Sequence, residues 1–407
     1  MFSAESLIDI LQNSFCLPNK IVGLHYFPTY STGVNNLVCH QTYTNNTGFD
    51  FVGRCLFSAE EPLNLEDLDD YQLYASSGGV LGGNWDTPME SCNTSWDVYI
   101  RILANSEHSQ LKRKYLKESN SSDWYFFYHG FAALDWFDHY KYLPVNKHVN
   151  FSYVFITYNH LIDLKRSYRM NLVANLLNRG LDKFGLISMP LISANVIRKE
   201  IFENKSTLLS AAAKKLIFNE FSNTNYSFVL DENENNINGS FSASINLNLN
   251  SRAFWHIVTE TVFYEEKLHL TEKIFKPIVS RQPFILVGAP GNLAYLKSYG
   301  FKTFDQWIDE SYDQEPDPDL RIKMIVDQIE KLSEYTLDEL KIMHHDMTDI
   351  LDYNRDHFYG KFKSIIVNEL VDNFKKIIDC SNFDRSSRFC IEDRLDYTEI
   401  KNRFLKY

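Results

Sequence analysis

The sequence predicts an α/β protein with parallel sheets and two core-bearing domains. Short apolar runs rich in β-branched and aromatic residues alternate along the chain with segments of helical periodicity. Strands separated by helices favour a parallel sheet with helices on both faces. The pattern restarts after residues 143–146, and 407 residues with 44% hydrophobic content are enough for two cores at about 100–200 residues per domain.

The first domain is expected to span residues 1–148 and to begin with an amphipathic helix at 3–13. Its later segments alternate between the period of a strand and the period of a helix. Strands are predicted at 20–27, 49–57 and 124–128, and helices at 96–103 and 132–140.

The second domain is expected to span residues 149–345 and repeats this alternation around a polar loop at 231–236. Residues 346–407 are expected to form C-terminal helices that pack back on the first domain. Strands are predicted at 151–158, 185–189, 226–230, 245–249, 254–262 and 284–288, and helices at 166–179, at 194–217, from 271, from 292 and across 318–375.

The composition argues against several classes of protein. No segment approaches the roughly 20 consecutive apolar residues of a membrane-spanning helix, and the first residues lack the basic and apolar regions of a signal peptide. The six cysteines are scattered, without a CxxC pair or a His cluster at metal-ligand spacing. We expect a cytoplasmic protein with reduced thiols and no membrane span. The formal charge of -12 argues against a broad nucleic-acid footprint.

The most informative stretch contains Thr271, Glu272 and Lys273 and precedes the strand predicted at 284–288. Thr271 is predicted to cap a helix whose first turn carries the other two residues. Amide donors, a carboxylate and an ammonium would then meet at one helix N-terminus, which suits a phosphodiester with a ribose. The alternative is a capped surface helix with a solvated Glu-Lys pair, because short motifs match freely.

This stretch resembles the nucleotide-sugar region of GT-B glycosyltransferases of the α1,3-fucosyltransferase type. In that family an acidic and an aromatic residue, here Glu260 and Tyr264, precede a Thr-Glu-Lys helix start, and an apolar strand then ends in Gly and Pro. The resemblance implies that Lys273 offsets the charge of the departing nucleoside diphosphate and that Glu272 holds the ribose. It also implies that Glu260 and Tyr264 shape the sugar pocket.

The resemblance extends upstream to a strand followed by Asn159 and by a helix that carries Arg166 and Arg169. In the family one arginine of this helix grips the diphosphate, and Arg169 matches that position, with Arg166 second. The planar fork of arginine binds phosphate oxygens in pairs and stays charged. An exposed basic helix face is the alternative.

The candidate catalytic residues lie in the first domain. The family places a glutamate at a strand end as the base that deprotonates the acceptor hydroxyl, and the match is Glu60, with Glu61 in reserve. Here Ala59 stands where glycine is usual, and no residue separates the two acids. A base must lie within about 3 Å of the acceptor oxygen, and an acidic turn is the alternative. His129 follows an apolar strand, where α/β ligand sites form, although it also suits a core or capping role.

The Asp-x-Asp combinations at 67–69 and 317–319 lie in acidic helical or loop segments. A GT-A enzyme would need such a pair at a strand end to hold a divalent cation. This absence favours GT-B, with two Rossmann-like domains facing a cleft and C-terminal helices crossing back. Cationic side chains and a helix terminus then stabilise the leaving group. We expect no metal and no cofactor, with the nucleotide-sugar as co-substrate.

The expected activity is transfer of a sugar from a nucleotide-sugar donor to a hydroxyl acceptor. The chain is also similar to viral and phage glycosyltransferase-like proteins, which implies a hydroxymethylated base in phage DNA as one acceptor and the host cytoplasm as the location. A DNA acceptor would need a basic strip, for which Lys112, Arg113, Lys114 and Lys117 are the candidates. The alternatives are a glycan-directed, fucosyltransferase-like enzyme and a non-catalytic GT-B-shaped binding module.

Overall fold

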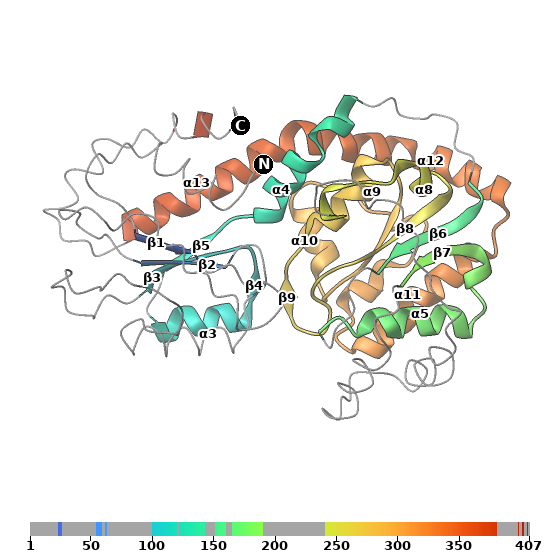
Figure 1. The fold of residues 1–407 in the computed structure, drawn as a ribbon, viewed down its shortest axis with the longest axis horizontal. Helices are drawn as coiled ribbons and strands as arrows, with labels where there is room; N and C mark the ends of the chain where they lie inside the picture. The colour runs from blue at the N-terminus through green and yellow to red at the C-terminus, as the bar shows by residue number, and fades with distance from the viewer. Residues whose placement is uncertain are drawn as a thin grey trace, which may run out of the picture. The chain divides into compact units, whose positions relative to one another are not determined.

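The structure, a computed structural model, contains two compact units, formed by residues 1–132 with 363–407 and by residues 133–362. Each unit is built on a parallel four-stranded sheet with helices (Figure 1), which confirms a mixed α/β class compatible with Rossmann-like folds. The candidate bases Glu60 and Glu61 lie outside the described residues. The structure describes residues 23–26, 54–58, 62, 100–119, 122–142, 151–159, 165–189, 241–380, 398, 401, 402 and 405.

The sheet of the first unit has the order β1-β2-β3-β5, so its described strands follow one another in space as they do along the chain. All of these strand pairs are parallel. The strands are β1 (Gly23–Tyr26), β2 (Arg54–Ser58), β3 (Ile100–Asn105) and β5 (Ser122–Tyr125), with the two-residue strand β4 (His108–Ser109); the helices are α3 (Gln110–Ser119), α13 (Lys363–Cys380) and α4 (Tyr128–Trp136), which the two units share.

Helices α3 and α13 lie on opposite faces of this sheet (Figure 1). The indole of Trp124 in β5 is only 1% exposed and donates its Nε1–H to the carbonyl of Leu370 in α13 at 3.2 Å. The ring of Phe374 packs on the same indole with ring centroids 4.8 Å apart. Asn373 adds a hydrogen bond from Nδ2 to the carbonyl of Tyr125 at 2.8 Å. Helix α13 is therefore fixed to β5 by both apolar and polar contacts.

The helix predicted over residues 96–103 is wrong over its described part, 100–103, because Ile100–Asn105 forms strand β3. This strand lies between β2 and β5 and pairs with both of them. Leu103 within it is completely buried. Periodicity does not separate a short, fully buried strand from a helical segment. The pairing partners, which are far away in sequence, decide the outcome.

The second unit contains the sheet β10-β8-β6-β7, and all of its strand pairs are parallel. Its strands are β6 (Tyr153–Tyr158), β7 (Gly185–Ser188), β8 (Ala253–Thr259), β9 (Lys267–Leu268, two residues) and β10 (Phe284–Val287); its helices are α5 (Tyr168–Asn178), α8 (Leu247–Asn250), α9 (Phe275–Val279), α10 (Asn292–Ser298), α11 (Pro318–Ser333) and α12 (Leu337–His357); shorter turns are η3 (Asp138–Tyr142), η4 (Asp182–Phe184), η5 (Phe241–Ala243), η6 (Glu272–Ile274), η7 (Glu310–Gln314) and the π-helical turn η8 (Phe358–Phe362).

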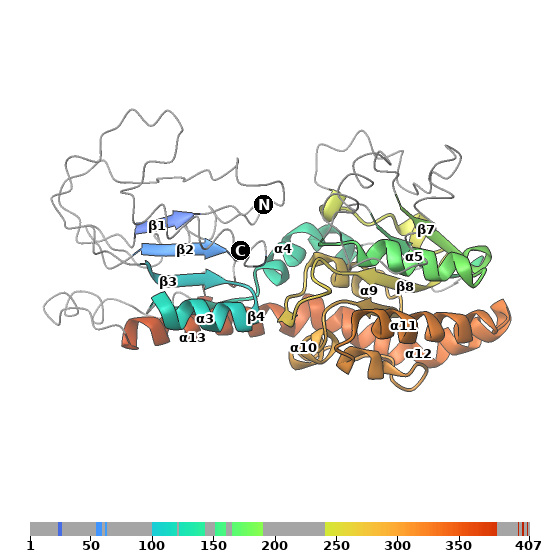
Figure 2. The same ribbon diagram turned by 90° about the horizontal axis from the view of Figure 1, so that it is seen from below.

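The chain reverses its direction of travel across this sheet between β6 and β8. From β6 the chain passes through α5 to β7 on one side, whereas β8 and β10 lie on the other side of β6. Helices α5 and α11 cover one face and α9 and α12 the other (Figure 1), and Figure 2 gives the view from the α5 and α11 side. Open α/β sheets bind ligands outside the carboxyl ends of their strands at such a reversal.

Strand β8 forms the centre of the second core, since all of its residues are buried. The packing against β6 is close enough to require glycine at one position. A Cβ atom on Gly185 in β7 would come within 2.2 Å of the Phe155 ring, so any larger residue there would displace that ring. Strands β6 and β7 therefore pack in close contact at this position.

The strand predicted at 245–249 is also wrong, because Leu247–Asn250 forms the one-turn helix α8. The side chain of Asn246 accepts a hydrogen bond from the Leu249 amide at 2.9 Å and caps this helix. Asparagine is among the favoured N-cap residues. The capping residue therefore outweighs the short alternation of apolar and polar residues.

Candidate functional site

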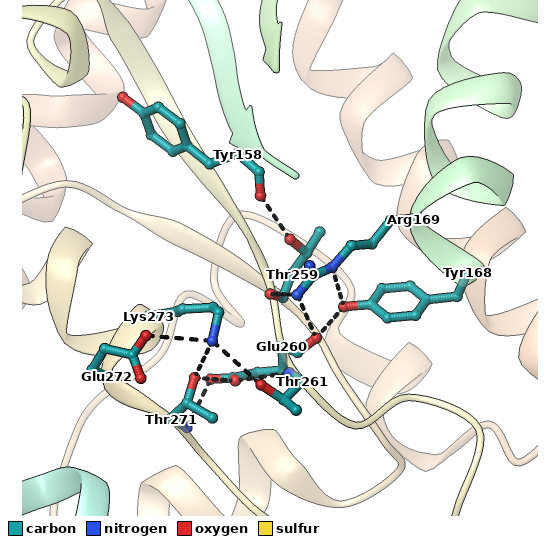
Figure 3. A network of polar contacts seen from close by, with 9 residues as sticks. All are labelled: Tyr158, Tyr168, Arg169, Thr259, Glu260, Thr261, Thr271, Glu272 and Lys273. Atoms are coloured by element: carbon teal, nitrogen blue, oxygen red, sulfur yellow. Dashed lines mark hydrogen bonds and ion pairs between the residues drawn. The ribbon is translucent and has the colours of Figure 1, made fainter. Parts of the chain in front are cut away.

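Polar side chains meet where β6 and β8 end, at the reversal of the second sheet (Figure 3). Thr259 is the last residue of β8, and its hydroxyl donates to the carbonyl of Tyr158, the last residue of β6, at 2.9 Å. Glu260 follows immediately and is completely buried. The two strand ends are thus tied together, with a carboxylate beside them.

The carboxylate of Glu260 joins two segments of the chain. Its Oε2 accepts from the Thr271 hydroxyl at 2.6 Å and from the Thr261 amide at 3.2 Å, and its Oε1 accepts from the Thr271 amide at 3.2 Å. Hydrogen bonds to a carboxylate are stronger than neutral ones. Glu260 therefore fixes the backbone at Thr271 to the carboxyl end of β8.

Lys273 is the most exposed charged group of this cluster. Its Nζ donates to the Thr271 hydroxyl at 3.0 Å, to the Thr261 hydroxyl at 3.3 Å and to Oε1 of Glu272 at 3.4 Å. The Lys273 side chain is 33% exposed, compared with 5% for Glu272. The ammonium is therefore held in place by three contacts (Figure 3), on a side chain of which a third is exposed.

Arg169, the residue expected to grip a diphosphate, lies against the end of β8 and is only 3% exposed. Its Nη2 donates to the carbonyl oxygens of Thr259 at 3.2 Å and Glu260 at 3.1 Å. The Tyr168 hydroxyl donates to the same Glu260 carbonyl, and burial raises the pKa of that hydroxyl. Arg169 and Tyr168 thus stabilise the backbone on which the Glu260 carboxylate is mounted.

Arg166 precedes helix α5, and Tyr264 contacts the N-cap residue of that helix, Ser167. The Tyr264 hydroxyl is 2.8 Å from the hydroxyl of Ser167, and burial raises the Tyr264 pKa to about 12. The phenol is therefore neutral at physiological pH. Arg166 is 7% exposed, and its carbonyl accepts from the amide of Arg169 at 3.1 Å. Arg166 is thus close to the Tyr168–Arg169 pair in sequence, and Tyr264 is close to it through the contact with Ser167.

The helix start expected at Thr271 is present, but the expected cap is wrong. Thr271 occupies the N-cap position of η6 without a side-chain hydrogen bond to that turn. Its hydroxyl proton is given to Glu260. The turn has three residues and continues into the five-residue helix α9. So short a helix contributes little positive charge at its N-terminus. The positive charge at this turn is therefore that of the Lys273 ammonium.

The start of α10, which follows the Gly-Pro end of the β10 strand, is already occupied by a carboxylate. Asp313 accepts from the amides of Leu293 at 2.8 Å and Ala294 at 3.1 Å. Burial raises the pKa of Asp313. Carboxylates at a helix N-terminus satisfy unpaired amides and the helix dipole, so this helix start is not the anion site of the unit.

His129, the remaining candidate catalytic residue that the structure describes, belongs to the first unit. It lies in the first turn of α4, after β5, as the sequence predicts. It is 6% exposed, and its ring meets that of Tyr128 edge-on with centroids 5.4 Å apart. The structure brings Arg166, Arg169, Glu260, Tyr264, Thr271, Glu272 and Lys273 into the second unit.

The sequence missed a buried polar cluster around Lys112 in the first unit. Lys112 Nζ donates to Asn105 Oδ1 at 3.1 Å, forms an ion pair with Asp123 at 3.1 Å and lies 3.4 Å from Nδ1 of His108. Burial lowers the pKa of Lys112, and burial with the nearby Lys112 charge lowers that of His108 to about 4. The signal was available, since Lys112 shares a helix face with Tyr115, three residues later.

This burial removes Lys112 from the basic strip expected on α3, whose exposed cations are Arg113, Lys114 and Lys117. Within the described ranges, no group of three or more His, Cys, Asp or Glu side chains could hold a metal ion, and none of the helices there is long and apolar enough to cross a membrane. Comparisons with protein-family models, curated proteins and solved structures each gave no match to this chain.

Proposed function

We propose that this chain is a nucleotide-sugar-dependent glycosyltransferase whose second unit binds the nucleoside diphosphate at the carboxyl ends of β6 and β8. The observation that carries the proposal is the position of Lys273. Its ammonium is held beside the reversal of a parallel sheet by two hydroxyls and a carboxylate, and a third of its side chain is exposed. Ligands of open α/β sheets bind at such reversals.

The chemistry of sugar transfer needs a fixed positive charge at this place. As the bond from the sugar to the diphosphate breaks, negative charge builds up on the leaving phosphate oxygen. A preorganised cation stabilises that charge at no cost of reorganisation. Lys273 supplies it as a point charge, and the hydrogen bonds of Arg169 and Tyr168 to the Glu260 carbonyl keep its support rigid.

The remaining roles follow from the neighbours of Lys273. Glu272 lies next to the ammonium and is suited to accept hydrogen bonds from the ribose hydroxyls. Tyr264, as a neutral phenol, is suited to donate to the transferred sugar. We extend the proposal to a GT-B architecture in which the first unit binds the acceptor, supported by the two separate parallel-sheet units. Glu60, with Glu61 in reserve, remains the predicted base, and His129 remains a candidate catalytic residue.

The experiment is a melting-temperature screen of the full chain with UDP-, GDP-, CMP- and TDP-sugars. A ligand at a hundred times its dissociation constant adds about 2.7 kcal/mol to the stability. We expect one nucleotide to raise the melting temperature of the wild type and to raise that of Lys273→Met by at most about half as much, because tenfold weaker binding leaves about 1.4 kcal/mol of stabilisation at the same ligand concentration. The matched control is Lys323→Met, which removes an exposed lysine from α11 of the same unit.

Transfer itself is measured with the donor that the screen identifies, using glycan acceptors and DNA containing hydroxymethylcytosine. Release of the nucleoside diphosphate that depends on one acceptor supports the enzyme and identifies its acceptor class. Binding without transfer to any acceptor would instead support the non-catalytic binding module. The absence of a response to every nucleotide-sugar would contradict the proposed donor site.

A further inference from the structure

The contacts around Thr271 have a direction that elementary chemistry fixes. The Glu260 carboxylate receives the Thr271 hydroxyl proton at 2.6 Å, and the amides of Thr261 and Thr271 converge on the same carboxylate. A hydroxyl has one proton and two lone pairs. Because its proton is directed to Glu260, the Thr271 oxygen can only accept from its other polar neighbour.

That neighbour is Lys273, whose ammonium has only protons to give. Its Nζ lies 3.0 Å from the Thr271 oxygen, the shortest of its contacts to Thr271, Thr261 and Glu272. The chain of hydrogen bonds therefore runs one way, from Lys273 through Thr271 to Glu260. Each donor in this chain has an acceptor, so the ammonium is held at the end of β8 by a chain of hydrogen bonds that ends on the buried Glu260 carboxylate.

We infer that Thr271 is a positioning residue, whose hydroxyl holds the Lys273 ammonium at the carboxyl end of β8 so that it can bind a diphosphate. Glu260 acts through Thr271, because its carboxylate is completely buried and is bonded to Thr271 and Thr261. Glu260 thus orients the cation and does not contact the sugar. The inference rests on the proposed function, since it concerns how that site binds its phosphates.

The lengths of the Lys273 contacts indicate which partner a phosphate replaces. Glu272 is the longest contact, at 3.4 Å, and it is an anion. A phosphate and a carboxylate compete for the same N–H of an ammonium. The Thr271 contact, which is shorter and neutral, can persist when a phosphate arrives.

A structural role for the hydroxyl can be separated from this positioning role. The amides of Thr271 and Thr261 each donate to Glu260 at 3.2 Å, independently of the Thr271 side chain. In Thr271→Val these backbone bonds still attach the segment to β8, and only the hydroxyl is lost. Thr271→Ser keeps the hydroxyl and loses a methyl group. The two variants are therefore a matched pair with opposite predictions.

The test is isothermal titration of the full chain with inorganic pyrophosphate, UDP and GDP. For Thr271→Val we expect about tenfold weaker binding of pyrophosphate and of the nucleotide that binds, or 1.4 kcal/mol. For Thr271→Ser we expect affinities within about twofold of the wild type, as rescue by the conservative variant. The melting temperature without ligand should fall by about 3–12 °C for Thr271→Val, because the buried Glu260 carboxylate loses one of its donors.

Each outcome decides a different claim. Equal affinity of Thr271→Val and wild type for a bound nucleotide overturns the positioning role and leaves the proposed function standing. Pyrophosphate binding that depends on the hydroxyl, without binding of UDP or GDP, supports the positioning role and contradicts a UDP or GDP donor. A wild type that binds none of the three probes overturns the positioning role and a UDP or GDP donor, and the screen with CMP- and TDP-sugars then decides the proposed function. If Thr271→Val does not fold, Thr271→Ala removes the hydroxyl without adding a methyl group beside the ammonium, and the same tenfold loss is expected.

Discussion

Each unit of the protein has a lysine near the carboxyl ends of its parallel strands, and the two lysines differ in their surroundings. In the first unit the Lys112 side chain is 4% exposed and contacts Asn105 and Asp123. In the second unit the Lys273 side chain is 33% exposed and contacts two threonine hydroxyls and Glu272. Lys112 is enclosed, and Lys273 is held but can still be reached by a ligand.

The sheets that carry these two lysines also differ in their strand order. The described strands of the first sheet follow the chain order, whereas the second sheet reverses between β6 and β8. A reversal separates the helices that follow the two strands, which is what opens a ligand site in α/β proteins. The comparison teaches that a lysine after a strand is informative only together with its burial and the topology of its sheet. The predictions below test this difference.

The largest effect is expected for Lys112→Met, as a loss of about 2–3 kcal/mol in the free energy of unfolding. Removing one partner of a buried ion pair leaves the other without compensation, and the Asn105 Oδ1 acceptor also loses its donor. Because the Asp123 side chain is 37% exposed, the expected loss of stability is smaller than that for a fully buried ion pair. Urea unfolding at pH 7 measures it, and a change below about 0.5 kcal/mol would contradict the structural role of Lys112.

Lys273→Met should show the opposite division between stability and binding. The lysine is a third exposed and its contacts are to hydroxyls and one carboxylate, so its removal should cost less than about 1 kcal/mol of stability. Affinity for the nucleoside diphosphate should fall at least tenfold, or about 1.4 kcal/mol. Urea unfolding checks the stability and calorimetric titration checks the affinity, each measured beside Lys112→Met. Equal nucleotide affinity in Lys273→Met and wild type would remove the distinction between the two lysines.

Local sequence patterns were sufficient for most of the second unit as far as the structure describes it. The strands predicted at 151–158, 185–189 and 284–288 and the helices predicted at 166–179 and from 292 are confirmed, with shorter bounds. Their apolar runs and helical periods agree with their burial. The two errors, at 96–103 and 245–249, occurred where five to eight residues fit two periods. At 96–103 the pairing with neighbouring strands decided the structure, and at 245–249 the capping side chain of Asn246 did.

The candidate site was predictable in its residue types and not in its contacts. Motif order brought Glu260, Thr271 and Lys273 together, and the structure shows them in one cluster. The direction in which Arg169 points depends on carbonyls ninety residues away. Burial of Lys112 depends on Asp123 in a neighbouring strand. Such long-range contacts leave no periodic signal in the sequence, so exposed and enclosed cations could not be separated.

Acid should weaken the cluster around Lys112 through His108. The His108 pKa is lowered from 6.5 to about 4 by burial and the nearby Lys112 charge. Because the unfolded chain binds the proton more readily, lowering the pH from 6.5 towards 4 favours unfolding, and the neutral form is stable above this window. Between pH 7 and pH 6 the wild type should lose about 0.7 kcal/mol more stability than His108→Gln. Parallel losses in both proteins would contradict this cause.

The smallest effect is expected for Lys114→Met, only two positions from Lys112 on the same helix. Lys114 is 63% exposed and lies 3.9 Å from the carboxylate of Glu118, itself 56% exposed. Water screens such a pair, so the stability should change by less than about 0.5 kcal/mol. Urea unfolding of Lys114→Met and Lys112→Met measures the two losses of stability side by side. The substitution and the helix are the same in both variants, so the two variants differ in the burial of the lysine. Equal losses in the two variants would show that burial does not explain the importance of Lys112. The expected difference of about 2 kcal/mol would show that one run of basic residues combines a lysine of the core with a lysine of the surface.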